Sequence, residues 1–204
     1  MNEGGRHVLA LLHELEHELT RQGSPFAATA APPVEISRLQ EAERTLGNAF
    51  PDELRAWWLW HDGSRARPGE SSAHLLGVGG FEPYSLERAL SEWDEWSRRS
   101  IFRERSSSEW KFLESWLPIA GAASAKRLNA KLESSTPEHL TLGLLEIEWA
   151  PHEFGRTLAL TMPELISGWI DYLRGGHVRW DDEAGAWLET FPRPAGYDTG
   201  LFWG

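Results

Sequence analysis

Apolar residues near the start of the chain recur every three or four positions. They are Val8, Leu12, Leu15 and Leu19. This spacing places them on one side of an α-helix, which we expect over residues 6–22. Residues 24–35 are rich in proline and alanine, and because proline interrupts a helix they predict a linker.

Two short helices are predicted after the linker. The first runs from residue 37 to Leu46 and ends at Gly47, because glycine readily adopts the positive φ of a helix end. The second begins after Pro51, since proline is favoured at the start of a helix, and ends at the Asp-Gly pair of residues 62–63.

The pattern then mixes strands with helices. The glycine-rich apolar stretch 75–81 predicts a strand with a bulge or a tight turn, and Ser85 can cap a helix that reaches residue 99. Further strands are predicted at residues 116–120, 127–132, 142–149 and 157–160.

A last helix, residues 162–174, precedes a hairpin formed by residues 177–180 and 186–189. This order predicts an α+β fold. We expect a single domain with a mainly antiparallel or mixed central sheet, helices packed in its N-terminal half, and one closing helix before a C-terminal hairpin. The predicted divisions are a leading amphipathic helix (1–23), a linker (24–35), the α+β domain (36–190) and a C-terminal tail (191–204).

The composition is that of an acidic globular protein. The 204 residues hold no cysteine, which excludes disulfides and cysteine zinc sites, and the net charge of −11 opposes binding to nucleic acid and to anionic membranes. No apolar run is long enough for a secretory signal or a membrane span, so we expect a cytoplasmic protein. Most of the 12 tryptophans are expected in the core, but tryptophan is also enriched at protein interfaces.

The segment His13-Glu14-Leu15-Glu16-His17 has the H-E-x-x-H form of a zinc protease, in which two histidines bind zinc and the glutamate activates water. In the predicted leading helix, however, both histidines point away from the leucines and toward solvent. No predicted sheet precedes this helix to bind a substrate strand. A zinc hydrolase is therefore a remote alternative, and we predict no catalytic residue, cofactor or metal site.

Two other patterns carry little chemistry. Residues 77–80 (Gly-Val-Gly-Gly) suggest a phosphate loop but lack the third glycine in register, so they favour a strand bulge or a turn. Arginines beside aromatic residues can bind single-stranded nucleic acid, but nearby glutamates favour a charged loop here. These arginines are Arg98, Arg99, Arg103 and Arg105.

Acidic residues and two tryptophans are the candidates for binding a protein partner. Glu146 and Glu148 lie two residues apart on one face of a predicted strand, beside Trp149, although an exposed polar strand face explains them equally well. Trp60 is turned away from the apolar face of its helix, which makes it the first candidate for an aromatic anchor. The hairpin turn adds Asp181, Asp182 and Glu183. An acidic surface steers a basic partner toward it.

Three segments, in this order, resemble the SUKH superfamily, which includes a yeast cell-wall synthesis regulator. The first is residues 36–64, the second is the strand SWLPIA at 115–120, and the third is the apolar helix at 159–176 with its central Trp169. In the first segment, the family's helix ends and starts correspond to Leu46-Gly47, Phe50-Pro51 and Asp62-Gly63.

The resemblance implies an α+β domain that binds a protein and is not an enzyme. As a class, the superfamily is best known for bacterial immunity proteins, which bind and block a cognate toxin, often a nuclease. The resemblance therefore implies a partner that is a basic toxin domain. The alternative is a regulatory or scaffolding module that binds an endogenous protein, and the sequence leaves the oligomeric state open. The chain departs from the family at Asn129 and Lys131, in a strand where many members carry an aspartate.

Overall fold

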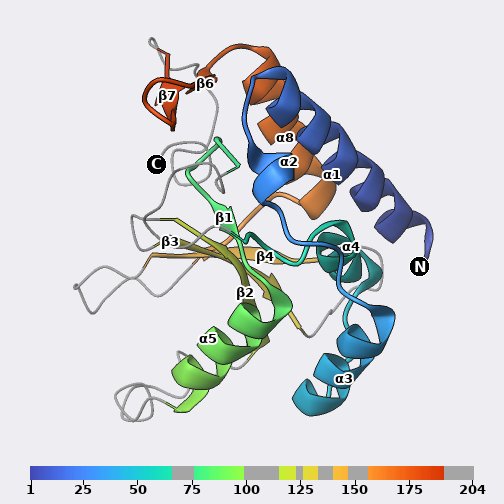
Figure 1. Cartoon of the computed structure of the whole chain (residues 1–204). Coiled ribbons are helices and arrows are strands. Elements are labelled where there is room, and N and C mark those ends of the chain that lie inside the picture. Colours follow the sequence, from blue (N-terminus) through green and yellow to red (C-terminus); the bar gives the residue numbers. More distant parts are fainter. Residues whose placement is uncertain (66–75, 99–114, 123–125, 133–139, 147–155, 191–204) are drawn as a thin grey trace.

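The computed structural model describes residues 1–65, 76–98, 115–122, 126–132, 140–146 and 156–190 (Figure 1). Its helices are α1 (Glu3–Arg21), α2 (Phe26–Thr29), α3 (Ile36–Leu46), α4 (Asp52–Trp60), α5 (Leu86–Arg98) and α8 (Met162–Arg174). Its strands are β1 (Glu82–Pro83), β2 (Trp116–Gly121), β3 (Lys126–Lys131), β4 (Leu142–Glu146), β5 (Arg156–Thr157), β6 (Val178–Asp181) and β7 (Ala186–Glu189). Within these ranges no helix is long and apolar enough to cross a membrane.

In the described part of the chain, five strands form an antiparallel sheet in the order β1-β2-β3-β4-β5. Each strand pairs with its neighbour in the sequence, and the register of β2 shifts between Pro118 and Ala120. The strands β6 and β7 form a separate hairpin that follows α8. The predicted α+β class, the antiparallel sheet and the closing helix before a hairpin are confirmed.

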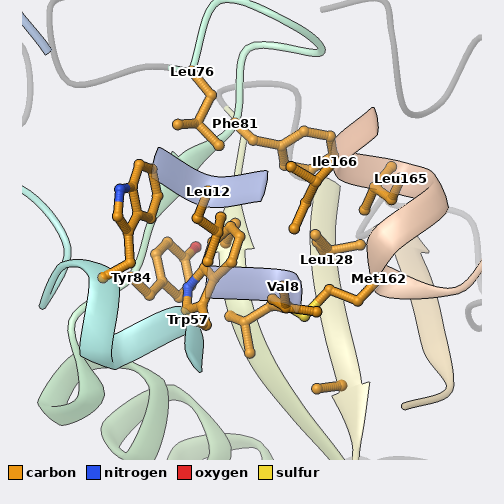
Figure 2. Packing of buried hydrophobic residues seen from close by; sticks show 14 of the residues in the cluster. Val8, Leu12, Trp57, Leu76, Phe81, Tyr84, Leu128, Met162, Leu165 and Ile166 are labelled. Atoms are coloured by element: carbon orange, nitrogen blue, oxygen red, sulfur yellow. The ribbon is translucent and has the colours of Figure 1, made fainter. Parts of the chain in front are cut away.

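The two sides of the sheet differ in chemistry, because successive residues of a strand point to opposite sides. Leu128 of β3 lies close to Met162 and Ile166 of α8 in the hydrophobic core (Figure 2). The preceding residue, Arg127, points toward α5, where its Nε donates to Glu92 Oε2 at 3.1 Å. The main core therefore lies between the sheet and the helices α1, α4 and α8, whereas α5 covers the opposite side with buried apolar residues, Leu86 and Ala89, and with polar contacts.

The apolar stripe of α1 enters this core as predicted. Its members are each 0% exposed: Val8, Leu12, Leu15 and Leu19. Farther along α1, the carboxylate of Glu18 accepts from Arg21 Nε at 2.6 Å and from Arg174 Nε of α8 at 3.0 Å. Burial alone would raise the pKa of Glu18, but the two arginines outweigh it and lower this pKa below its ordinary value.

The segment predicted as a linker contributes to the same core. It contains α2, and both Phe26 and Val34 are buried. The amides of Ala31 and Val34 donate to the carbonyls of Gly63 and Trp58, each at 2.9 Å. These bonds fix the segment against α4, so α1 is joined closely to the helices that follow it.

Residues 76–81 form turns, and the strand predicted for this stretch is wrong. Three of its glycines have φ between 63° and 77°, values that an extended strand does not allow: Gly77, Gly79 and Gly80. The amide of Leu76 donates to the carbonyl of Phe81 at 2.9 Å and closes the turn. The strand that pairs with β2 begins only at β1.

Gly47 ends α3 at the predicted position, whereas α4 already ends at Trp60, two residues before the predicted Asp-Gly pair. Gly47 and Gly63 have φ of 71° and 73°. A Cβ on Gly47 would meet no atom within 4 Å, whereas a Cβ on Gly63 would lie 2.5 Å from the amide nitrogen of Ser85. The neighbouring Asp62 caps α5 by accepting from the amide of Leu86 at 2.7 Å. The Asp-Gly pair therefore holds the turn after α4 against the start of α5.

We expect Gly63→Ala to destabilise the protein much more than Gly47→Ala. Both alanines carry the cost of a positive φ, about 1–2 kcal/mol, but only the alanine at position 63 also collides with the backbone of Ser85. Urea unfolding of the two variants measures the difference. Equal losses in the free energy of unfolding would contradict the close contact between the turn after α4 and the start of α5.

We expect Glu18→Gln to lower stability at neutral pH and to have less effect in acid. A carboxyl whose pKa is lowered in the folded state stabilises that state above its unfolded pKa, here 4.5, and the stabilisation is lost as the pH falls through the folded pKa. Urea unfolding of the wild type and the variant, at about pH 7 and about pH 3, checks this. The exposed Glu41→Gln is the control, and the same loss for Glu18→Gln at both pH values would show that charge is not the cause.

Candidate functional site

Trp60 is buried, so its prediction as an exposed anchor is wrong. The residue is 1% exposed. Its ring stacks on Phe26, with the ring centroids 5.4 Å apart, and its Nε1 donates to Glu16 Oε2 of α1 at 2.9 Å. The helices α1 and α2 cover the side of α4 that lies away from its apolar stripe. Trp60 therefore stabilises the docking of α1.

The H-E-x-x-H segment of α1 does not form the site of a zinc protease. His13 and His17 are exposed, as predicted, with the His13 side chain 62% exposed. Glu14, which would have to activate a zinc-bound water, instead accepts from Arg174 Nη2 of α8 at 2.7 Å. In the described ranges, no group of three or more histidine and acidic residues is arranged to hold a metal ion.

Glu16, in the same segment, has a structural role. Besides the bond from Trp60, its Oε2 lies 3.2 Å from His61 Nε2, and His61 Nδ1 lies 2.8 Å from the carbonyl oxygen of Ala31. Both ring nitrogens of His61 therefore face acceptors. These side chains join α1 to the end of α4 and to the segment after α2.

The predicted acidic strand face is described only in part. Glu146 is the last residue of β4, and its backbone pairs with that of Lys126 in β3. Glu148 and Trp149 lie outside the described residues, as does most of the predicted arginine-rich loop. The binding roles of these residues stay predictions.

The acidic turn of the hairpin is held by its own hydrogen bonds. Asp181 accepts from the amide of Ala184 at 2.9 Å, and Asp182 accepts from Trp180 Nε1 at 2.8 Å. Asp182 and Glu183 are exposed, whereas Asp181 is half-buried. The turn therefore presents negative charge to solvent on a backbone that its own side chains fix.

A cluster that the sequence analysis missed lies between α5 and the sheet, and we call it the α5 polar layer. Its members are Glu82, Tyr84, Arg88, Glu92 and Arg127. The guanidinium of Arg88 lies 3.8 Å from the centre of the Tyr84 ring, and its Nη1 donates to Glu82 at 2.8 Å. Glu92 accepts from Arg88 at 3.4 Å and from Arg127 of β3 at 3.1 Å. The layer thus connects α5 to both β1 and β3.

The hydroxyl of Tyr84 is buried within this layer. Burial raises the pKa of Tyr84 far above its ordinary value, Glu92 raises it further, and Arg127 and Arg88 oppose the change. A side chain at Gly121 would collide with this hydroxyl, so the glycine of β2 makes room for it. Tyr84 therefore stays neutral and braces α5 on the sheet, with no means of serving as a base or a nucleophile near neutral pH.

A shallow hollow of about 530 Å³ lies at the end of α3. It is lined by Gln40, Glu43, Arg44, Gly47, Asn48 and Ala49. The one carboxylate in this lining, on Glu43, accepts from the amide of Phe50 and from Arg55 Nε, both at 2.8 Å. This carboxylate is thus used to fix the turn between α3 and α4, and the hollow brings together no pair of groups for acid–base chemistry.

Comparison with known families agrees with the resemblance drawn from the sequence. Residues 33–128, a little under half of the chain, match the SMI1/KNR4 family (SUKH-1). The matched region runs from the segment before α3 into β3, so α1, α8 and the hairpin lie outside it. No curated protein sequence matches the chain.

We expect Glu16→Ala to weaken the docking of α1. The substitution removes the acceptor of the buried Trp60 indole and one partner of His61, and an unsatisfied buried donor costs about 1–3 kcal/mol. His17→Ala, at an exposed position of the same helix, is the control and should change stability by less than about 0.5 kcal/mol. Thermal and urea unfolding measure both variants. Equal stability of Glu16→Ala and the wild type would contradict the role given to Glu16.

Proposed function

From the SUKH-1 match over residues 33–128, we propose that this chain is a bacterial immunity protein. It binds a cognate toxin domain in a one-to-one complex and blocks the toxin sterically, inside the cell that makes both proteins. The match is the observation that carries the proposal, because immunity proteins are the best-known class within this superfamily.

The polar contacts of the described residues support binding rather than catalysis. Glu14 and Glu18 of α1 accept hydrogen bonds from Arg174 of α8, and Glu16 accepts one from Trp60 of α4. The α5 polar layer is likewise bonded within itself. Carboxylates used in this way stabilise a rigid framework, and a rigid framework suits a protein that acts through its surface.

Charge favours a basic partner. The chain carries a net charge of −11, and toxins that cleave nucleic acid need a basic surface to bind it. Opposite net charges accelerate association and help an inhibitor reach its target before damage occurs. A nuclease toxin therefore fits the proposal best.

The hairpin turn is the proposed contact on which a mutation is most informative. With Trp60 buried, Asp182 and Glu183 are the members of the predicted partner-binding set whose exposure the structure shows. Asp182 accepts a hydrogen bond from Trp180 Nε1, so its substitution would also disturb the hairpin, and Glu183 is therefore the better position to change.

We expect the chain to protect cells from the toxin encoded beside its gene, and Glu183→Lys to weaken that protection. Charge reversal at a binding surface slows association and weakens binding by about tenfold or more. Glu41→Lys is the matched control: it makes the same change on an exposed residue of α3, which lies at the other end of the molecule from the hairpin (Figure 1). Survival on co-expression and the dissociation constant of the purified pair are the measurements.

Two outcomes would count against this account. Failure of the wild-type chain to protect cells would favour the alternative, a regulatory or scaffolding module for an endogenous protein. Protection with equal binding by Glu183→Lys and Glu41→Lys would keep the immunity role and remove the hairpin turn from the interface.

A further inference from the structure

Two exposed histidines of α1, His13 and His17, form a pair for which the fold described so far has no use. His13 and His17 are four residues apart on a helix, and side chains at this spacing are neighbours on adjacent turns, with Cβ atoms about 5–6 Å apart. Both residues are exposed, and the His13 side chain is 62% exposed. Two imidazoles at this spacing can bind one metal ion together.

The helix that carries the pair is held rigidly. On its opposite side the four residues of the apolar stripe are 0% exposed, and Glu14 and Glu18 bond to Arg174 of α8. An ion binding to His13 and His17 therefore does not have to order the backbone first, which is the main cost of a site on a mobile segment.

The surroundings of His13 also favour coordination. Its Nδ1 lies 3.8 Å from Glu16 Oε2, on the side of the ring away from Nε2. This distance is too long for a hydrogen bond, but the negative charge of the carboxylate attracts a cation bound to the ring. Glu16 itself is fixed by Trp60 Nε1 at 2.9 Å.

We propose that His13 and His17 form a two-histidine surface site for a late first-row divalent ion, namely Cu²⁺, Ni²⁺ or Zn²⁺. Imidazole nitrogen is a preferred ligand of these ions, whereas Mg²⁺ and Ca²⁺ require oxygen ligands. The remaining coordination positions face solvent. The bound ion has no hydrolytic role, because Glu14 is held by Arg174 and does not reach a metal-bound water.

Isothermal titration calorimetry of the untagged chain with Ni²⁺ tests this site. We expect one strong site per chain, with His13→Ala and His17→Ala each weakening its affinity by about tenfold or more. His7→Ala is the matched control, since His7 is exposed on the same helix but has no histidine four residues away. Cu²⁺ should bind more tightly than Ni²⁺ at this site, and Mg²⁺ should not bind.

The proposal fails if the chain binds no Ni²⁺, or if the double variant His13→Ala/His17→Ala binds it as tightly as the wild type. Equal weakening by His7→Ala and His13→Ala would also overturn it, because that result points to non-specific binding by any exposed histidine. Thermal unfolding of each variant in the absence of metal excludes a loss of fold as the cause. None of these results bears on the toxin-binding proposal, which does not involve α1.

Discussion

The docking of α1 on α4 and α8 is the contact on which the rest of the fold depends. Each of the four aliphatic side chains in its stripe contributes about 1.5–3 kcal/mol when fully buried, and the bonds of Glu16 and Glu18 fix the helix in position. Both α1 and α8 lie outside the SUKH-1 match at residues 33–128. The matched segment alone would therefore lack two of the three helices that cover the apolar side of the sheet, and we infer that the folding unit extends beyond the match in both directions.

One side of the sheet is apolar and the other combines apolar and polar contacts, so the helices on the two sides are held differently. The apolar side receives the closely packed core shown in Figure 2. The other side is bound by α5 through the α5 polar layer, in which paired charges satisfy one another beside the neutral Tyr84. The turn after α4 meets the start of α5 at Gly63, where no side chain fits. Hydrogen bonds and ion pairs, together with apolar burial, therefore hold α4 and α5 in place beside the sheet.

Much of the fold could be predicted because it follows from local signals. Helical spacing identified α1, proline marked the start of α8, and glycine with positive φ ended α3 at Gly47. What failed depends on tertiary contacts. The burial of Trp60 requires α1 and α2 to cover a second side of α4, which no pattern within α4 indicates. The stretch at 76–81 has strand-like composition, but its glycines adopt turns.

The candidate site could be predicted less well, because a charged side chain is available to a partner only where no other residue of the fold is bonded to it. The sequence alone does not show that Glu14 accepts a hydrogen bond from Arg174, or that Asp182 accepts one from Trp180 within the hairpin. The Arg88–Glu92 pair has the four-residue spacing of a helical ion pair and could have signalled the α5 polar layer, whereas the contribution of Arg127 comes from a distant strand.

Central to the proposal is that the chain neutralises a toxin by binding it and blocking it sterically. Titrating the purified chain into a fixed amount of the toxin encoded beside its gene, while the toxin's activity is recorded, tests this claim most directly. The account predicts that activity falls linearly and reaches zero at one chain per toxin. Full toxin activity in the presence of a large excess of the folded chain would contradict it.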